Sequence, residues 1–341
     1  MCGSIKQFFA PGGASKAISC QLIGAAILFT ALRAVAAAGG CVPSPAGLVS
    51  WWRGENSTGD AVGGNNGTIA GTGTVTYGPG MVGQAFVFDG THRDRVDLGN
   101  PASLQLQDFT LEAWIKRSSP TVSSFDVLGA DGSVCGDGAC IIGYGRGGYI
   151  LAVANDGRLI LSRTDIDGVI SAPLITDLNW HHLAVTKAGS NAVFYVDGVA
   201  QATPAYVPHE PYTFDDGTCS CTAAIAIGSR GDARGGTFYG MIDEPAVFNR
   251  ALSASEIQSI YTAGSAGMCA RLTGKLTLSR APDGTMRLRG PAAPEALYII
   301  QASTNLLNWQ QIGVTTNNGT ASFEFDDTNP SRMRFYRVVS P

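Results

Sequence analysis

Residues 238–264 read FYGMIDEPAVFNRALSASEIQSIYTAG, and this stretch says most about the fold. A β-run ends near Arg250 and a short helix follows it. Ser253 suits the N-cap of that helix, and Glu256 three residues later completes a capping box. Gly264 suits the position at which the helix stops. The apolar face of the helix is made of Ile257, Ile260 and Tyr261. We therefore predict a β-strand that leads into one short amphipathic helix.

Short apolar runs fill most of the chain before this stretch. In residues 109–116 they alternate, so that Phe109, Leu111, Ala113 and Ile115 share one face of a strand. Further predicted strands are 85–88, 150–154, 159–163, 180–187, 192–196 and 223–228. Asp-Gly pairs at 89–90, 156–157, 167–168 and 197–198 mark turns between them. Strands punctuated this regularly, with one helix near the end, predict an all-β fold built as a two-sheet sandwich.

Residues 1–38 have the composition of a signal peptide. Lys6 and Lys16 supply positive charge, residues 17–32 form an apolar run, and residues 34–38 are small enough for cleavage. The run is shorter than the ~20 residues that a membrane-spanning helix needs. We therefore expect a protein exported to the periplasm, cell surface or medium, with no membrane span in its mature chain. An uncleaved N-terminal anchor is the alternative.

The charge balance argues against a polyanionic partner. The chain carries 23 Lys and Arg against 27 Asp and Glu, a net charge of −4. The whole acidic excess lies in residues 39–272, where Asp far outnumbers Glu. An acidic domain disfavours nucleic acid and anionic lipid as partners. Asp is both a turn residue and a calcium ligand, so its excess suits a β-rich, Ca²⁺-binding domain.

Four stretches between residues 47 and 264 resemble the laminin-G-like jelly-roll domains of the concanavalin A-like lectin and glucanase superfamily. They are GLVSWW (47–52) with NNGT (65–68); GQAFVFDG (83–90) with VDLG (96–99); FTLEAW (109–114) with WHHLAV (180–185) and YVDG (195–198); and IDE (242–244) with the helix after it. The resemblance implies a jelly-roll sandwich with one short C-terminal helix over residues 39–272. The sequence departs from the family's usual pattern at His92-Arg93, where an acidic pair is more common, and at Pro245, which is expected to interrupt the final strand.

Some members of this superfamily bind a structural Ca²⁺ ion on the sandwich. The matching positions here are Glu55, the turn Asp89-Gly90, and Asp243. Carbonyl groups and water would complete the roughly six to eight oxygens that Ca²⁺ requires. The alternative is that Asp89 only makes a turn and that Asp243 only pairs with an arginine. The resemblance thus implies a Ca²⁺ site as a hypothesis.

The acids do not form a catalytic pattern. Retaining glycosidases on this superfold carry acids at positions i and i+2 of one strand, within reach of one glycosidic bond. Glu112 is followed at i+2 by a tryptophan. Asp243 and Glu244 are adjacent and so face opposite ways. Asp165 and Asp167 run straight into a turn. We therefore expect no enzyme activity, with a polysaccharide-active glycosidase or lyase as the alternative.

Recognition of a polysaccharide or a cell-surface ligand is the expected function, and a purely structural surface module is a further alternative. Sugar sites combine aromatic side chains with polar groups. The candidates are aromatic residues in or beside Gly-rich and Pro-rich loops: Tyr144, Tyr149, Tyr212 and Phe214. The alternative is that these aromatics pack in the core. One imidazole of His181-His182 is expected to be a core or edge group, and chance explains the adhesion tripeptide at 230–232.

Six cysteines follow residue 38: Cys41, Cys135, Cys140, Cys219, Cys221 and Cys269. An even number in an exported chain indicates disulfides, and zinc binding is the alternative. Cys41 and Cys269 bracket the jelly roll, whose ends often lie close together, so we predict that they pair; lipidation of Cys41 competes. A bond between Cys219 and Cys221 would be strained. We therefore predict that the 135/140 loop is cross-linked to the 219/221 loop.

The pattern changes after Cys269. Predicted strands are 275–279, 285–289, 297–303, 310–314, 321–325 and 335–339. Residues 273–341 are expected to form a small immunoglobulin- or fibronectin III-like sandwich. QASTN (301–305), NW (308–309) and RFYRV (334–338) resemble C-terminal modules of large exported bacterial proteins.

Overall fold

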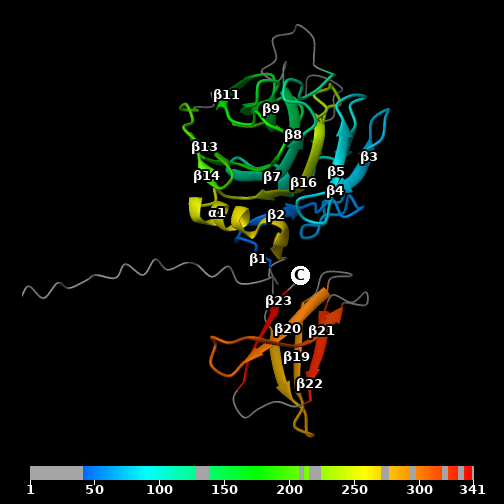
Figure 1. Ribbon diagram of the computed structural model, residues 1–341, viewed down its shortest axis with the longest axis vertical. Coiled ribbons are helices and arrows are strands. Elements are labelled where there is room, and N and C mark those ends of the chain that lie inside the picture. Colours follow the sequence, from blue (N-terminus) through cyan, green and yellow to red (C-terminus); the bar gives the residue numbers. More distant parts are fainter. Residues whose placement is uncertain are drawn as a thin grey trace, which may run out of the picture. The chain divides into compact units, whose positions relative to one another are not determined.

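A computed structural model describes residues 41–126, 138–206, 211–214, 224–269, 276–291, 297–316, 322–328 and 334–339. The predicted all-β jelly roll is confirmed: two mostly antiparallel sheets pack against each other, and one short helix follows the last strand (Figure 1). The predicted strands between residues 85 and 228 all appear near the expected positions.

The first sheet has seven strands in the order β11-β10-β9-β8-β15-β6-β3 within the described residues. Their bounds are β3 (Thr68–Ala70), β6 (Arg95–Asp97), β8 (Gly138–Tyr144), β9 (Tyr149–Ala154), β10 (Arg158–Arg163), β11 (Asp167–Pro173) and β15 (Ile225–Ile227). A short 3₁₀ helix, η1 (Ala102–Leu104), precedes β7.

The second sheet runs in the order β14-β13-β12-β7-β16-β5-β4, and β2 also pairs with β16. Its strands are β2 (Leu48–Trp51), β4 (Thr76–Pro79), β5 (Gln84–Asp89), β7 (Phe109–Arg117), β12 (Trp180–Ala188), β13 (Asn191–Val196), β14 (Val199–Ala200) and β16 (Tyr239–Phe248).

The main core lies between the two sheets. The alternation predicted for β7 is confirmed, because Phe109, Leu111 and Ile115 face this core together with Tyr149 and Leu151 of β9. The other face of the second sheet is also covered. There α1 (Ala254–Ala263) places Ile257 and Ile260 against a second apolar cluster that includes Trp51, Ala246 and Phe248. The capping box of Ser253 and Glu256 is present as predicted.

Strand β16 changes partner part-way along its length. Its first residues pair with β5, where Tyr239 lies opposite Asp89 and Ile242 lies opposite Phe86. Its later residues pair with β2, beginning with Ala246 opposite Trp51. A β-bulge separates the two halves, since the register shifts between Asp243 and Ala246. The segment that follows β2 and the segment that precedes β5 therefore meet beside this bulge.

Pro245 does not interrupt the final strand as the sequence predicted. It lies inside the bulge, where its carbonyl accepts a hydrogen bond from the Trp52 backbone N–H at 3.0 Å. Glu244 beside it has a φ of +55°, in the left-handed region that few non-glycine residues adopt. A proline lacks only a donor, and a bulge needs no donor from it. The bulge thus lets β16 continue.

The predicted Cys41–Cys269 disulfide is confirmed, across a sequence separation of 228 residues. Beside it β1 (Val42–Pro43) pairs in parallel with β17 (Met268–Cys269), just after the 3₁₀ turn η2 (Gly264–Ala266). Cys140 is buried in β8. Cys135, Cys219 and Cys221 lie outside the described residues, so the cross-link between the two loops stays a prediction.

The C-terminal segment, considered by itself, contains two three-stranded antiparallel sheets among its described residues, in the orders β18-β19-β22 and β21-β20-β23. The strands are β18 (Thr277–Arg280), β19 (Met286–Pro291), β20 (Leu297–Ser303), β21 (Gln310–Thr316), β22 (Ser322–Asp327) and β23 (Phe335–Val339). Leu288, Tyr298, Ile300 and Phe323 form its core. The strands fall where the sequence predicted. The immunoglobulin- or fibronectin III-like identity and the boundary at 272/273 stay predictions.

Within the described ranges, the helices are too short or too polar to span a membrane.

Candidate functional site

The four predicted calcium ligands do not converge on one point. Asp89 lies opposite Tyr239 on β16, four residues along the strand from Asp243. At about 3.3 Å per residue this separation is roughly 13 Å. Glu55 and Asp243 come together at the bulge of β16, whereas Asp89 and Gly90 belong to a loop at the far end of β5. The prediction of one site from Glu55, Asp89, Gly90 and Asp243 is therefore corrected to two separate places.

Glu55, Asp243 and the turn at residues 80–84 make the first place, the bulge site. Asp243 is fully buried, and its Oδ2 accepts a hydrogen bond from the Val82 backbone N–H at 2.8 Å. Within the described ranges its Oδ1 has no hydrogen-bond partner. Oε2 of the exposed Glu55 accepts from the Gln84 backbone N–H at 3.2 Å. Both carboxylates thus lie over the same turn.

Glycine suits this turn because Gly83 has a φ of +54° and because the backbone of Gly80 lies close to the buried Asp243. A Cβ atom added to Gly83 would lie 2.0 Å from Glu55 Oε1. A Cβ atom added to Gly80 would lie 2.5 Å from Asp243 Oδ2. The turn therefore holds the two acidic groups near one another and leaves no space for a further side chain.

The electrostatics of the bulge site are compatible with a bound cation. Burial raises the pKa of Asp243 to about 7 against the lowering effect of backbone N–H groups, and Glu55 raises it further. Burial and the neighbouring Asp243 also raise the pKa of Glu244, whose Oε2 accepts from Trp51 Nε1 at 2.8 Å. A buried carboxylate oxygen without a donor, beside other acids, fits a bound divalent ion.

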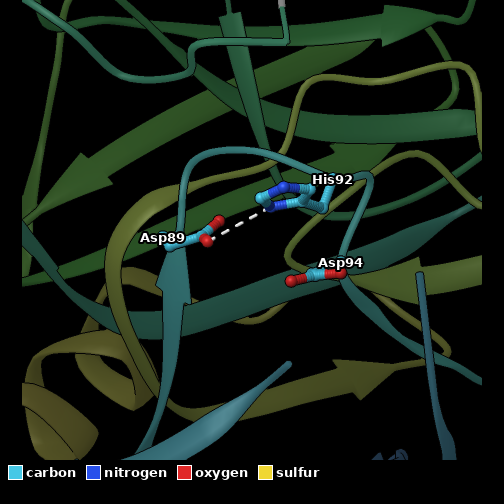
Figure 2. Close-up of side chains that lie close together, drawn as sticks. All are labelled: Asp89, His92 and Asp94. Atoms are coloured by element: carbon cyan, nitrogen blue, oxygen red, sulfur yellow. Dashed lines mark hydrogen bonds and ion pairs between the residues drawn. The ribbon is translucent and has the colours of Figure 1, made fainter. Parts of the chain in front are cut away.

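The loop after β5 makes the second place, the loop cluster of Asp89, His92 and Asp94 (Figure 2). Each residue offers one ligand atom, and these atoms lie within 4.8 Å of one another. Asp89 and His92 are exposed, and Asp94 is buried. These three residues could hold a metal ion.

Sequence reasoning found only Asp89 of this cluster. The loop closes on itself because His92 and Arg93 both adopt the left-handed region, with φ of +64° and +56°. Two consecutive non-glycine residues in that region are uncommon, and no spacing rule predicts them. The acidic pair expected at 92–93 is absent, so the only signal in the sequence was an imidazole between two aspartates.

An aromatic pair, the exposed Phe125 and the half-buried Tyr239, lies beside the loop cluster. Phe125 is 56% exposed and packs on Tyr239 with ring centroids 4.9 Å apart. The Phe125 backbone N–H donates to the Gly90 carbonyl at 2.8 Å, which fixes the pair to the same loop. Sequence reasoning did not select either residue.

The aromatic residues that the sequence predicts for ligand binding lie in the core or pack against it. Tyr144, Tyr149 and Tyr212 are at most 4% exposed. Phe214 is half-buried and packs on Tyr144 with centroids 4.8 Å apart. The hydroxyl of Tyr149 donates to the Leu104 carbonyl at 2.7 Å. The prediction that Tyr144, Tyr149, Tyr212 and Phe214 form an exposed sugar platform is therefore wrong, and the packing alternative holds.

The acids weighed as catalytic groups are held by partners. Glu112 is buried, with Oε2 2.5 Å from Nε2 of the fully buried His182. His182 is thus the core imidazole that the sequence predicted. Asp165 accepts two hydrogen bonds from Arg230 at 2.7 Å, and Asp167 accepts from the Tyr206 hydroxyl at 2.9 Å.

His181 lies between two carboxylates at the edge of the second sheet. Its Nδ1 is 2.9 Å from Asp197 and its Nε2 is 3.0 Å from Asp177. The hydrogen bond to Asp197, followed by that to Asp177, raises the pKa of His181 from 6.5 to about 9, although burial opposes the shift. Both ring nitrogens therefore act as donors near neutral pH.

We predict a pH dependence of stability from this group. Its folded pKa is raised, so its contribution is complete below pH ~6.5 and is lost as the pH rises through about 9. Because Asp177 is half exposed, the effect is limited to about 1–2 kcal/mol. Urea unfolding at pH 6 and pH 9.5 measures it. His181→Gln, which cannot take a proton, should lack this part of the pH dependence; an identical profile in the variant would contradict the assignment.

A family model described as the concanavalin A-like lectin/glucanases superfamily matches residues 89–258. The jelly roll belongs to this superfamily. The matched range begins at Asp89 of the loop cluster, includes Asp243, and ends inside α1.

Several solved structures resemble the chain in fold. Domain 4 of AbnA, a GH43 extracellular arabinanase from Geobacillus stearothermophilus solved with arabinotriose, is 20% identical over 62% of this chain and 96% of its own, with a TM-score of 0.47. The binding domain of Paraclostridial Mosquitocidal Protein 1 is 14% identical over 80% of this chain and 72% of its own, with a TM-score of 0.46. Trypanosoma rangeli sialidase is 16% identical, with a TM-score of 0.42; 64% of this chain covers only 33% of the sialidase. No curated protein matches the chain.

Proposed function

We propose that the jelly roll is an exported, non-catalytic recognition module that binds a polysaccharide or another cell-surface glycan. The description of its superfamily names lectins and glucanases, which bind or cleave glycans. A disulfide that joins the two ends of the domain suits an oxidising, extracytoplasmic compartment.

The non-catalytic role is supported mainly by the surroundings of the acidic residues that lie on or beside the strands. Glycoside hydrolysis needs two carboxyl groups that flank an accessible bond. In the described part of the chain Glu112 is sealed against His182, and Glu244 is buried against Trp51. Asp165 is neutralised by Arg230. These acids serve packing and pairing, which favours a lectin-like role over that of a glucanase.

The surface best suited to a sugar is the aromatic pair Phe125 and Tyr239. An exposed aromatic face buries the apolar side of a pyranose ring, and nearby polar groups fix its hydroxyls. Asp89, Thr91 and His92 supply such groups on the adjoining loop. The hydrogen bond from the Phe125 N–H to the Gly90 carbonyl joins the aromatic pair to the loop that carries these polar groups.

The bulge site is proposed to hold a structural Ca²⁺ ion, with Glu55 and Asp243 as its carboxylate ligands. The unpartnered Oδ1 of Asp243 supports this assignment. The ion would neutralise two acids where β16 changes partner, and so would stabilise the fold rather than contact the glycan.

Phe125→Ala is expected to weaken glycan binding about tenfold, the equivalent of about 1.4 kcal/mol. A glycan array identifies the ligand, and affinity electrophoresis then compares variants. Val199→Ala removes an equally exposed apolar side chain from β14 and should bind like the parent. The same preparations are assayed for release of reducing ends. Turnover of any bound glycan would overturn the non-catalytic role. Equal losses of glycan affinity in both variants would show that Phe125 is not part of the binding site.

A further inference from the structure

We propose that Asp89, His92 and Asp94 bind a divalent transition-metal ion of the zinc class. One imidazole nitrogen and two carboxylate oxygens would hold the ion, and its remaining coordination positions would face solvent. The site is distinct from the bulge site, and it goes beyond glycan recognition.

The geometry of the three side chains already approaches that of a metal site (Figure 2). Their ligand atoms lie within 4.8 Å of one another, and Asp89 Oδ2 is 3.3 Å from His92 Nδ1. Zinc holds nitrogen and oxygen ligands at about 2.0–2.2 Å, which places neighbouring ligands about 3.3–3.6 Å apart in a tetrahedral shell. Small side-chain rotations would therefore close the shell.

Asp94 gives an independent indication that a ligand is missing. The residue is 1% exposed, and its Oδ1 accepts from the Gly73 backbone N–H at 2.8 Å. Its Oδ2 is buried and has no hydrogen-bond partner among the residues that the structure describes. Burying a carboxylate oxygen that has no partner in the described part of the chain is costly. A cation at the cluster would satisfy it.

The carboxylate of Asp94 and the imidazole of His92 both lie next to Gly73. A Cβ atom added there would lie 2.3 Å from Asp94 Oδ2 and 3.1 Å from His92 Nδ1. The absence of a side chain at Gly73 thus lets the carboxylate and the imidazole approach each other. Its backbone lies outside the left-handed region, so a side chain there is excluded by the two ligands rather than by φ.

The donor set decides the class of metal. Ca²⁺ and Mg²⁺ prefer oxygen ligands alone, and calcium takes about six to eight of them. An imidazole with two carboxylates suits borderline ions such as Zn²⁺, and three protein ligands leave a position open for water or a ligand oxygen. Because His92 is one of the ligands, this loop favours a zinc-like ion over the Ca²⁺ ion predicted for Asp89.

His181 provides an internal comparison with the same composition. It too lies between two aspartates, but its two ring nitrogens face different carboxylates. In the described part of the chain, His181 and its two aspartates are not among the groups whose ligand atoms all lie within 4.8 Å of one another. One histidine and two aspartates are therefore not sufficient to form a metal site. The loop cluster differs because all three of its ligand atoms lie close to one another.

The test is Zn²⁺ titration of the full chain by calorimetry, without any glycan, together with the visible absorption of Co²⁺ added in place of zinc. We expect one zinc equivalent that His92→Ala and Gly73→Ala each weaken by about 100-fold or more. Both positions are exposed, so the variants should fold, which their metal-free melting curves verify. His181→Ala is the matched control and should keep the full affinity and the Co²⁺ spectrum.

Retention of that zinc equivalent in His92→Ala would overturn the proposal, because the ion would then lie elsewhere. Tighter binding of Ca²⁺ than of Zn²⁺ at a site sensitive to His92 would overturn the choice of metal class. Since no glycan is present, failure here leaves the recognition function untouched, and loss of glycan binding leaves the metal site untouched.

Discussion

Replacement of Asp243 by asparagine is expected to stabilise the metal-free protein and to abolish its response to Ca²⁺. In the metal-free state the buried carboxyl has a pKa raised from 3.8 to about 7, chiefly by burial. Its contribution to stability is therefore complete below pH ~4 and is lost as the pH rises through about 7. Above that pH the charged group costs up to about 4 kcal/mol, which an amide of the same shape does not.

In the presence of Ca²⁺ we expect the parent protein to be more stable than the Asp243→Asn variant. An ion that binds only the folded state adds about 2.7 kcal/mol at a hundredfold excess over its Kd, and removal of the Asp243 charge removes that gain. The measurement is the melting temperature at pH 8 in EDTA and in Ca²⁺. Asp177→Asn, a change at an exposed acid, should keep the parent's calcium response. A parent melting temperature that ignores both calcium and chelator would withdraw the bulge site.

Arg230→Met is expected to destabilise the jelly roll by about 3–5 kcal/mol. The guanidinium is 1% exposed, and it donates to both oxygens of Asp165 and to Asp232, all within 2.7–3.1 Å. Burial works to lower the pKa of Arg230, and the two carboxylates outweigh burial and raise it. Removal of the cation leaves Asp165 without its counter-charge and leaves Asp232 with only the more distant, exposed Arg234, at 3.9 Å.

Urea unfolding measures this loss. Arg146→Met, a change at an exposed arginine, is the control and should cost less than about 0.5 kcal/mol. Adding Asp165→Asn and Asp232→Asn to Arg230→Met should recover much of the loss, because no unpaired charge then remains buried. An Arg230→Met variant as stable as the parent would show that the triad contributes nothing.

The same arginine shows why the tripeptide Arg230-Gly231-Asp232 is not an adhesion motif. Its two charged side chains pair with each other and are both buried. The sequence suggested chance as the explanation, but it could not show the partner. Asp165 is 65 residues away and reaches Arg230 only because the turn after β10 and the loop after β15 meet.

The sequence predicted strands and the helix well because their signals are local. Alternation, Asp-Gly turns and a capping box each act within a few residues. It failed for the aromatics because β8 and β9 are buried on both faces. Without a solvent face there is no alternation, so Tyr144 and Tyr149 beside glycines looked exposed.

The prediction of the site failed where the register between distant strands determines which residues lie close together. Glu55 and Asp243 were identified as partners by family position, and they do meet. The sequence groups Asp89 with them, but Asp89 lies four strand residues from Asp243, and only the pairing of β5 with β16 reveals that distance. The partnership of Asp89 with His92 and Asp94 depends on left-handed backbone at two non-glycine residues, which residue types do not signal.

The bond between Cys41 and Cys269 also determines how the jelly roll responds to mechanical load. Tension applied to the chain on its two sides enters at Cys41 and leaves at Cys269, so the covalent bond carries it. The parallel pairing of β1 with β17 lies inside the covalent loop and is shielded from this tension. The 227 residues between the two cysteines therefore form a loop that bears no force, and stretching of the whole molecule leaves both candidate sites undistorted.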